Sequence, residues 1–290
     1  MGRGMNRQNT GWLFISLAVA AITIFYFYPM LQALLLSFQS GMGANLEYVG
    51  LANYIRLFND PTFLTALKNT LLYLLIQVPL MIVLALIFSV LLNDATLKFR
   101  SFFRIAIFLP CVTSLVAYSV IFKYLFGMDG LVNQFLLNVS LISAPIQWLS
   151  DPFWAKVTII VAITWRWTGY NMIFYLSSLQ NVDQSIYEAA KIDGATPFQQ
   201  FTKITIPMLK PIILFTSITS TIGTLQIFDE VVNITNGGPG NATLSISQYI
   251  YNLSFEYTPD FGYASTVSYV IVMLVVVLSI VQFKVAGEKK

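Results

Sequence analysis

Histidine is absent from this 290-residue sequence, and cysteine occurs once, at Cys111. A single cysteine cannot form a disulfide within the chain, and a chain without histidine lacks the commonest general base and the usual zinc ligand sets. Because no nucleophile can be paired with a histidine base, the sequence disfavours a membrane-embedded enzyme. We therefore expect no catalytic residue and no metal site.

Charged residues are also scarce, at 10% of the chain, whereas apolar residues make up 57%. Both values lie outside the usual range of globular domains and indicate a protein that crosses a membrane several times. The sequence also lacks a Gly-x-x-x-x-Gly-Lys-Ser/Thr loop, the motif that cradles nucleotide phosphates. We expect the chain itself to bind no ATP and no other cofactor.

Six apolar segments are long enough to span a bilayer as helices, which takes about twenty residues each. They occupy residues 12–38, 70–92, 102–126, 153–179, 208–232 and 261–283. The first segment follows Arg3 and Arg7 as a signal peptide would, but it is too long for a signal-peptide core and has no small-residue cleavage site. We expect a retained first helix in an all-α protein with six transmembrane helices.

Positive charges predict the orientation of these helices, because lysine and arginine gather in cytoplasmic loops. Eleven of the sixteen cations fall on one side of the predicted spans. They are Arg3, Arg7, Lys98, Arg100, Arg104, Lys191, Lys203, Lys210, Lys284, Lys289 and Lys290. Both termini and the segment 181–207 are therefore expected in the cytoplasm.

That segment is polar, although it lies between the fourth and fifth predicted spans. Ser185 and Glu188 have the spacing of a capping box, in which the two side chains satisfy unpaired amides at the start of a helix. Gly194 is suited to end the helix, because glycine adopts the left-handed conformation without steric cost. Ala189 and Ala190 leave one helix face nearly bare, which favours docking into a groove of a partner.

A second short helix is expected in the same segment. Thr196 and Pro197 match the preferred N-cap and first position of a helix. Pro207 is expected to end this helix near the membrane. The sequence thus predicts two short helices with a sharp corner at a membrane surface.

The segment also contains a recognisable motif. It reads Glu188-Ala189-Ala190, three residues, Gly194, nine residues, and Ile204-Thr205-Ile206-Pro207. This pattern resembles the EAA loop of binding-protein-dependent ABC importer permeases, the membrane subunits through which ATPases drive uptake. The family pattern ends in Ile-x-Leu-Pro, and Ile206 stands in place of the leucine here.

The resemblance implies a type I ABC importer permease fold in a prokaryotic cell membrane. It also implies three kinds of partner: a second similar permease, two ATPase subunits that bind ATP and Mg, and a solute-binding protein outside the cytoplasm. By the same resemblance, the coupling element that sits in an ATPase cleft would consist of Glu188, Ala189, Ala190, Gly194 and Pro207.

The expected domain organisation follows from the spans and the motif. Residues 1–69 would hold the cytoplasmic N-terminus, the first helix and an outer amphipathic segment. Residues 70–284 would form the permease core, with the coupling loop at 181–207. Residues 285–290 would be a cytoplasmic tail.

Two further stretches resemble sugar-type permeases of this family. In residues 50–63, mixed apolar and polar spacing favours a short helix in the membrane interface, and Asp60-Pro61 is expected to break it and start the next element. The sequence Thr235-Asn236-Gly237-Gly238-Pro239 is a turn cluster in a long outer loop. Such outer loops either contact an external partner or are plain connectors.

Polar side chains inside the predicted spans indicate a cavity or helix contacts, because they are costly in lipid. In the fourth span, the conspicuous group is Arg166, Trp167, Tyr170 and Asn171. These residues either line a passage for a hydroxyl-rich solute, with aromatic faces and amides that suit sugar rings, or pin helices together. For Arg166 we favour the pin.

In the fifth span, the candidates for the substrate path are Thr224, Gln226 and Asp229. Gln226 and Asp229 are three residues apart and are expected on one helical face, whereas most other hydroxyls of this span are expected to serve packing. In maltose-type members of the family, the helices before and after the EAA loop supply the sugar site. Tyr170 falls in the matching place by its distance from Glu188.

Two functions remain to be compared. The favoured one is the permease subunit of an ATP-driven ABC importer that carries a sugar, in particular an oligosaccharide. The alternative is a secondary transporter driven by an ion gradient, but such proteins commonly show two related halves, and none are visible here. The lack of a cation cluster at membrane depth favours a neutral sugar over a phosphate ester.

Overall fold

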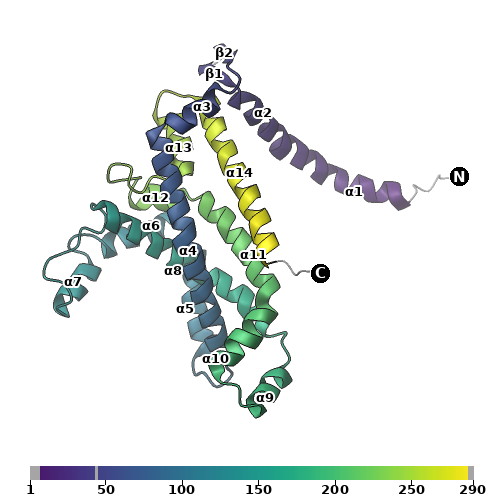
Figure 1. Cartoon of the computed structure of the whole chain (residues 1–290), viewed down its shortest axis with the longest axis vertical. Helices are drawn as coiled ribbons and strands as arrows, with labels where there is room; N and C mark the ends of the chain where they lie inside the picture. The colour runs from purple at the N-terminus through teal and green to yellow at the C-terminus, as the bar shows by residue number, and fades with distance from the viewer. Residues whose placement is uncertain (1–6, 43–44, 287–290) are drawn as a thin grey trace. The chain divides into compact units, whose positions relative to one another are not determined.

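The structure, a computed structural model, describes residues 7–42 and 45–286 (Figure 1). These residues fold mainly into helices and form one short β-hairpin. They divide into two compact units, of which the first comprises 7–60 and 250–270 and the second comprises 61–249 and 271–286.

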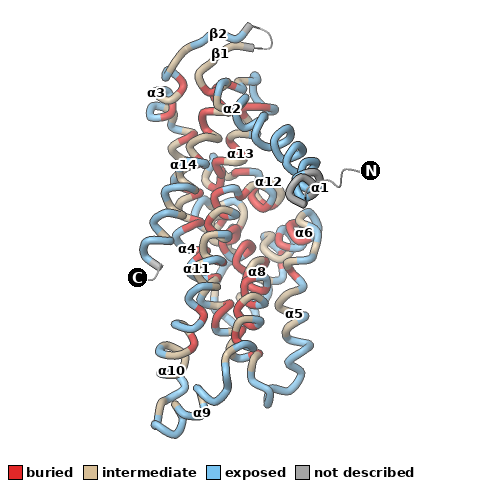
Figure 2. The backbone as a smooth tube through the Cα atoms, turned by 90° about the vertical axis from the view of Figure 1, so that its right-hand side faces the viewer, coloured by how far each residue is buried: buried red, intermediate tan, exposed pale blue. Residues whose placement is uncertain are grey.

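The first unit begins with one long helix that covers the predicted first span. It consists of α1 (Arg7–Ile22), a π-helical segment η1 (Thr23–Phe27) and α2 (Tyr28–Ser37). Most of its apolar side chains are exposed, as the pale blue tube of α1 in Figure 2 shows. A helix of this kind is suited to lipid, because its backbone groups bond to each other within the helix and its exposed side chains are apolar.

A hairpin that the sequence did not predict follows this helix. Strands β1 (Gln39–Met42) and β2 (Asn45–Tyr48) pair antiparallel. The predicted short helix is confirmed as α3 (Ala52–Asn59), and its place in the membrane interface stays a prediction. Asp60 has an extended backbone, so the break predicted at Asp60-Pro61 is also confirmed.

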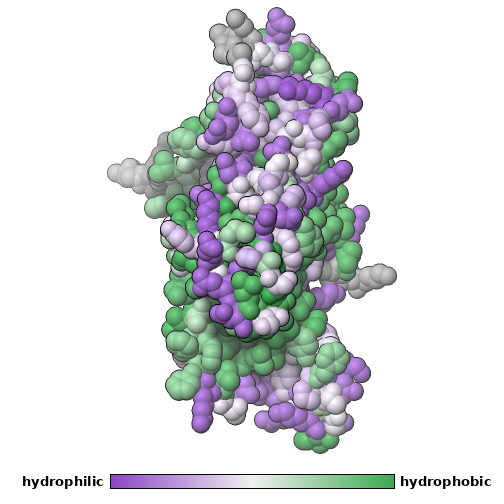
Figure 3. All heavy atoms as spheres, turned by 90° about the vertical axis from the view of Figure 1, so that its left-hand side faces the viewer, coloured by the Kyte–Doolittle hydropathy of each residue, from purple (hydrophilic) through white to green (hydrophobic). Residues whose placement is uncertain are grey.

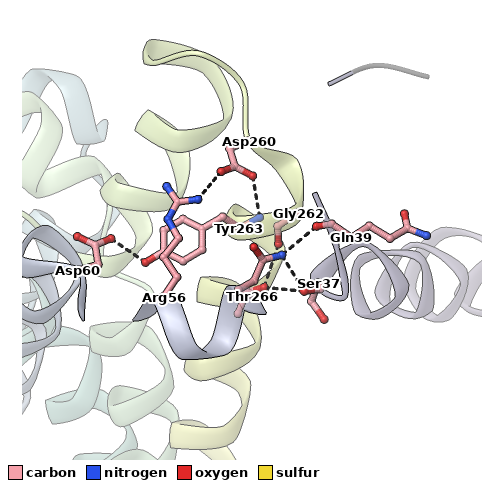
Figure 4. A network of polar contacts seen from close by, with 9 residues as sticks. Ser37, Gln39, Arg56, Asp60, Asp260, Gly262, Tyr263 and Thr266 are labelled. Atoms are coloured by element: carbon pink, nitrogen blue, oxygen red, sulfur yellow. Dashed lines mark hydrogen bonds and ion pairs between the residues drawn. The ribbon is translucent and has the colours of Figure 1, made fainter. Parts of the chain in front are cut away.

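Polar contacts join α3 to the start of α14 (Phe261–Ala286) within this unit (Figure 4). The Arg56 guanidinium forms a 2.7 Å ion pair with Asp260 and lies 3.8 Å from the centre of the Tyr263 ring. The Tyr263 hydroxyl donates to the Asp60 carboxylate at 2.7 Å. Charge pairing, stacking and hydrogen bonding therefore act on the same few side chains.

The end of α2 is held by side chains of its unit. The Ser37 carbonyl accepts hydrogen bonds from Asn53 and Thr266, both at 3.0 Å. Gly262 lies so close to the Gln39 carbonyl that a Cβ atom would collide with it. The unit also contains a short π-helical segment, η3 (Asn252–Glu256).

The second unit is a helical bundle built on two long helices, α4 and α8, which pack along each other (Figure 1). Its elements are α4 (Pro61–Asn93), α5 (Arg100–Val112), α6 (Leu115–Leu125), α7 (Leu131–Asn138), α8 (Pro152–Leu179), α9 (Gln184–Ile192), α10 (Pro197–Gln200), η2 (Phe201–Thr205), α11 (Ile206–Leu225), α12 (Asp229–Ile234), α13 (Ile246–Tyr251, whose last two residues belong to the first unit) and the end of α14. Among the long helices, buried residues concentrate on α4 and α8 (Figure 2).

The helices of this bundle approach each other closely. On α8, Gly169 faces α5 at a distance that leaves no room for a side chain, because a Cβ would collide with the Ile107 carbonyl. The fully buried residues Ala85, Met172 and Leu209 bring α4, α8 and α11 into one core. Hydrophobic residues also cover a large part of the outer surface in Figure 3, as expected for a protein in lipid.

Four described helices are long and apolar enough to cross a membrane. They are Phe14–Ser37, Pro61–Asn93, Pro197–Leu225 and Phe261–Val285. The pair α5 and α6 passes the same test together, which gives up to five spans. Helix α8 has 28 residues and is long enough, but it carries Lys156 and Arg166 and is not among the four. The number six therefore stays a prediction.

The third span, predicted as the continuous segment 102–126, is broken in the structure. Helices α5 and α6 meet at a bend of 103°. Pro110 lies near the end of α5, and Thr113 is extended with φ −73° and ψ 150°. Because proline lacks an N–H, it weakens the helix at the point where the chain turns.

The fifth span, predicted as 208–232, is wrong at both ends. Pro207 does not end a helix but lies at the start of α11, directly after the π-helical segment η2. The helix is continuous from Pro197 to Leu225. It then stops at Leu225, before the predicted end.

Candidate functional site

A cavity of about 590 Å³ lies inside the second unit, between α4, α8, α11 and the turn that leads into α12. It is lined by all the residues that the sequence analysis assigned to the substrate path: Trp167, Tyr170, Asn171, Thr224, Gln226 and Asp229. The first three lie on α8, and the other three lie at the end of α11 and the start of α12. Two predicted spans thus contribute to one cavity.

Two buried amides on the cavity wall share a thioether sulfur as an acceptor. Gln77 on α4 and Asn171 on α8 are 1% and 2% exposed. Each donates from its amide nitrogen to the Met81 sulfur at 3.3 Å, and a thioether is a weak acceptor. Asn171 also donates to the Trp167 carbonyl at 3.1 Å, whereas its Oδ1 atom accepts no hydrogen bond. Because buried amides normally find strong partners, these two keep unused capacity to bind a polar molecule.

Aromatic side chains give the cavity flat apolar surfaces. Trp167 and Tyr170 meet edge to face, with ring centres 5.8 Å apart and an interplanar angle of 89°. Tyr170 continues to Phe174 on the same helix at 5.0 Å. Apolar faces next to a few polar groups are typical of sites for small organic molecules.

The acidic end of the cavity differs from the prediction. Gln226 is the C-cap of α11 and Asp229 begins α12, so the two do not lie on one face of a continuous helix. Carboxylates are favourable in the first turn of a helix, which supports a new helix start at Asp229 and Glu230. Asp229 is exposed, whereas Glu230 is buried and hydrogen-bonded by the Trp167 side chain.

Arg166 acts as the structural pin that the sequence analysis favoured. Its guanidinium donates to the carbonyls of Pro110, Thr113 and Cys111 at 3.2, 3.1 and 3.3 Å. These carbonyls lie at the break between α5 and α6, where they lack helical partners. The guanidinium also lies 5.0 Å from the centre of the Tyr118 ring. Arg166 is only 6% exposed, so its guanidinium is directed at these protein groups and not at solvent. Arg166 therefore stabilises the bend.

The sequence analysis missed the contribution of α4 to the cavity. Gln77 and Met81 line the cavity beside α8, and Thr224 donates to Gln77 at 3.0 Å. A signal was available, because Gln77 is an amide within an otherwise apolar run, two residues before Pro79. The spacing of residues along one helix shows which of them share a face, but it does not show which neighbouring helix that face contacts.

The polar loop contains the two predicted helices, but the first has a different cap. The N-cap of α9 is Asp183, whose carboxylate accepts from the Ser185 amide at 2.9 Å. The capping box predicted for Ser185 and Glu188 is wrong, because Ser185 already lies inside the helix. The hydrogen bond from Ser185 lowers the pKa of Asp183, which keeps the cap ionised.

The corner between the helices has the predicted geometry. Gly194 has φ +78°, the left-handed conformation that ends α9. Thr196 caps α10 and forms a reciprocal pair with Gln199: the Thr196 amide donates to the Gln199 side chain at 2.8 Å, and the Gln199 amide donates to the Thr196 hydroxyl at 3.3 Å. The Tyr187 hydroxyl lies 2.9 Å from the Thr205 hydroxyl and joins α9 to η2.

The outer face of this loop is exposed and partly apolar. Glu188 and Ala189 are exposed, and Ala190 is half-buried. Ile192 and Phe198 are 87% and 73% exposed. Apolar side chains held out on a rigid corner are typical of a docking surface.

Comparison with known proteins agrees with this geometry. A sequence model of the family described as "Binding-protein-dependent transport system inner membrane component" matches residues 61–286. The lactose transport system permease protein LacF of Rhizobium radiobacter is 59% identical over 282 residues, which cover 97% of this chain and 95% of that protein. The arabinooligosaccharides transport system permease protein AraP of Bacillus subtilis is 34% identical, with 98% of this chain and 91% of that protein covered.

A solved structure confirms the fold. It is the crystal structure of a bacterial ABC transporter involved in the import of the acidic polysaccharide alginate, and one chain of it matches with a TM-score of 0.81. The match has 23% sequence identity and covers 96% of both chains. These findings support the importer and not the ion-driven alternative. The chain therefore belongs to the family of inner membrane components of binding-protein-dependent transport systems, as a multi-pass ABC importer permease.

Proposed function

We propose that this permease carries a neutral oligosaccharide into the cell through the cavity between α4, α8 and α11. Lactose and arabinooligosaccharides, named for two of its relatives, are the first solutes to test. The observation that carries the proposal is the pair of buried amides, Gln77 and Asn171, which share the Met81 sulfur as an acceptor, while the Asn171 Oδ1 atom accepts no hydrogen bond. A sugar hydroxyl both donates and accepts, so it can satisfy these amides where the protein does not.

The charges of the cavity favour a neutral solute. Among the described residues that line it there is no lysine or arginine, whereas Asp229 and Glu230 lie at one end. An anionic phosphate ester would meet two carboxylates and no cation, which is unfavourable at low dielectric. The edge-to-face pair Trp167 and Tyr170 offers an apolar surface for a sugar ring.

The experiment is uptake into proteoliposomes that contain the complete importer. ATP is enclosed, and radiolabelled lactose is added with the purified solute-binding protein outside. The proposal is supported if labelled lactose accumulates saturably, and if unlabelled arabinooligosaccharides reduce this accumulation while glycerol 3-phosphate does not. The proposal is contradicted if glycerol 3-phosphate abolishes the accumulation of lactose and the arabinooligosaccharides do not.

The loop at 181–207 is proposed to couple this cavity to ATP hydrolysis on partner subunits. The coupling residues are Glu188, Ala189, Ala190, Gly194 and Pro207. The exposed side chains of Ile192 and Phe198 support docking into an apolar cleft, because burial of such side chains drives association. Pro207 connects the loop to α11, whose far end reaches the cavity.

The complete importer is proposed to contain two ATPase subunits, which bind ATP and Mg, a second permease and a solute-binding protein. In this arrangement both termini of the chain and the coupling loop face the cytoplasm. The proposed functional division is an N-terminal part at 1–69, a permease core at 70–284 and a short tail at 285–290. This composition is tested by purification of the complex and measurement of its subunit ratio. We expect two ATPase subunits for every pair of permeases.

A further inference from the structure

A second hollow, of about 330 Å³, lies in the second unit between α11 and the end of α14, which lie side by side (Figure 1). We call it the α11–α14 groove. It is lined by Ile206, Lys210, Ile213, Leu214 and Ser217 on α11 and by Val281, Gln282 and Val285 on α14. The α11 residues recur at helical spacing and form one continuous face. The groove therefore runs along the helix axes.

One end of the groove is closed by hydrogen bonds between the two helices. The Gln282 amide nitrogen donates to Ser217 at 3.3 Å and to Thr221 at 2.7 Å. On α14, Val281 beside this tie and Val285 one turn further along are 48% and 80% exposed. Hydrogen bonds thus join the two helices at one end of the groove. Along the rest of the groove, apolar side chains of both helices remain partly or fully exposed.

Lys210 gives the groove a single positive charge. It is exposed, and the one ion pair among the described residues joins Arg56 to Asp260 in the other unit. No aspartate or glutamate lines the groove within the described part of the chain. Lys210 also lies inside the apolar helix Pro197–Leu225. A cation at such a position is favourable when an anion is near it.

We propose that the α11–α14 groove binds an anionic phospholipid, with the phosphate at Lys210 and one acyl chain along Ile213, Leu214 and Val281. The distance from Lys210 to Ser217 is seven residues, or roughly 10 Å along a helix. This length accommodates an acyl chain over much of one leaflet, which is about 15 Å deep. The proposal does not depend on which solute the importer carries.

The charge and the shape of the groove favour a lipid over a helix of a second subunit. A single acyl chain is narrower than a helix, and its charged headgroup matches the one charge that the groove offers. The groove therefore fits a molecule with an apolar tail and an anionic end.

The test is native mass spectrometry of the complete importer after exchange into phosphatidylglycerol or phosphatidylcholine. We expect retained phosphatidylglycerol in the wild type and about fivefold weaker retention in Lys210→Gln, the effect of one cation at an anionic lipid. Lys284→Gln is the matched control, because Lys284 is exposed on α14 but does not line the groove. It should leave retention unchanged.

A second variant and a mapping step make the result decisive. Leu214→Trp fills the groove without changing its charge and should displace the lipid to a similar extent. A photoreactive phosphatidylglycerol should label peptides that contain residues 206–217 or 281–285. Equal retention in the wild type and Lys210→Gln, an equal loss in Lys284→Gln, or labelling elsewhere would overturn the proposal. So would a cross-link from Ile213→Cys to the second permease, since a protein would then occupy the groove.

Discussion

The cavity and the polar loop use hydrogen bonds in opposite ways. In the cavity, Gln77 and Asn171 are buried, yet their amide nitrogens share the sulfur of Met81, and Asn171 Oδ1 accepts nothing. In the loop, Asp183 and Thr196 are exposed, yet both have their acceptor oxygens engaged by backbone amides. The buried region therefore keeps polar groups available, and the exposed region uses them.

The difference teaches how each region can function. Polar groups left unsatisfied in a buried place are costly, so a ligand that satisfies them gains binding free energy. Helix caps satisfied in an exposed place make a rigid shape, so the loop can present Ile192 and Phe198 to a partner. We expect cavity substitutions to change solute affinity and loop substitutions to change coupling.

The largest effect is expected for Glu188→Lys. Reversal of the charge on the exposed face of α9 should reduce ATP-driven uptake about 100-fold, within the range of coupling free energies between sites. Membrane insertion and solute binding should be retained, because Glu188 is exposed and does not line the cavity. The measurement is uptake in proteoliposomes together with ATPase activity.

The matched control for this change is Asp193→Lys. Asp193 is an exposed C-cap of the same helix, where a positive charge is favourable. It should leave uptake within about twofold of the wild type. Equal losses in both variants would show that any charge reversal in the loop is harmful and would remove the special role of Glu188.

The next effect is expected for Arg166→Met, which tests the frame of the cavity. The carbonyls of Pro110, Cys111 and Thr113 would lose their guanidinium donor, at a cost of about 2 kcal/mol. The midpoint of thermal unfolding of the purified complex should fall. Arg166→Lys should recover part of the loss, because a single ammonium can reach fewer carbonyls than a guanidinium. An unchanged midpoint in Arg166→Met would exclude the pin.

A smaller effect is expected for removal of the cavity amides. Gln77→Leu or Asn171→Leu should raise the KM for the sugar about tenfold, which corresponds to about 1.4 kcal/mol for lost hydrogen bonds. The ATPase activity that Glu188 controls should persist. Gln134→Leu, an exposed amide on α7, is the control. A KM equal to that of the wild type in both cavity variants would falsify the proposed role of the amides.

The smallest effect is expected for Thr196→Ala in the loop. Loss of the N-cap should destabilise α10 by about 1 kcal/mol and lower uptake less than Glu188→Lys does. Faster amide hydrogen exchange at residues 198–200 is the measurement, because Pro197 has no amide hydrogen. Thr202→Ala is the control, because its hydroxyl bonds to backbone carbonyls within the helix and caps nothing. Equal exchange rates in the two variants would contradict the cap.

Local features of the chain could be predicted because they depend on neighbouring residues. The corner at Gly194, the cap at Thr196 and the break at Asp60-Pro61 were all correct. The box at Ser185 failed because Asp183 lies two residues earlier and is an equally good acceptor. Spacing alone does not decide between two competing caps.

Breaks inside apolar runs could not be predicted in the same way. The segments at 102–126 and 208–232 look continuous by composition, yet the first bends by 103° and the second stops at Leu225. The first break is stable because Arg166, more than 50 residues away in the chain, supplies donors to its carbonyls. Such a donor is invisible from either segment taken alone.

The sequence by itself determined that the chain is a helical membrane protein with an EAA-type loop, because apolar length, charge placement and turn chemistry are local properties. Only the tertiary structure decided that Gln77 and Met81 of α4 face Asn171 of α8 and that α11 opens beside α14. The physical reason is that packing between helices selects one face of each. Helical period fixes which residues share a face, but not which neighbour that face meets.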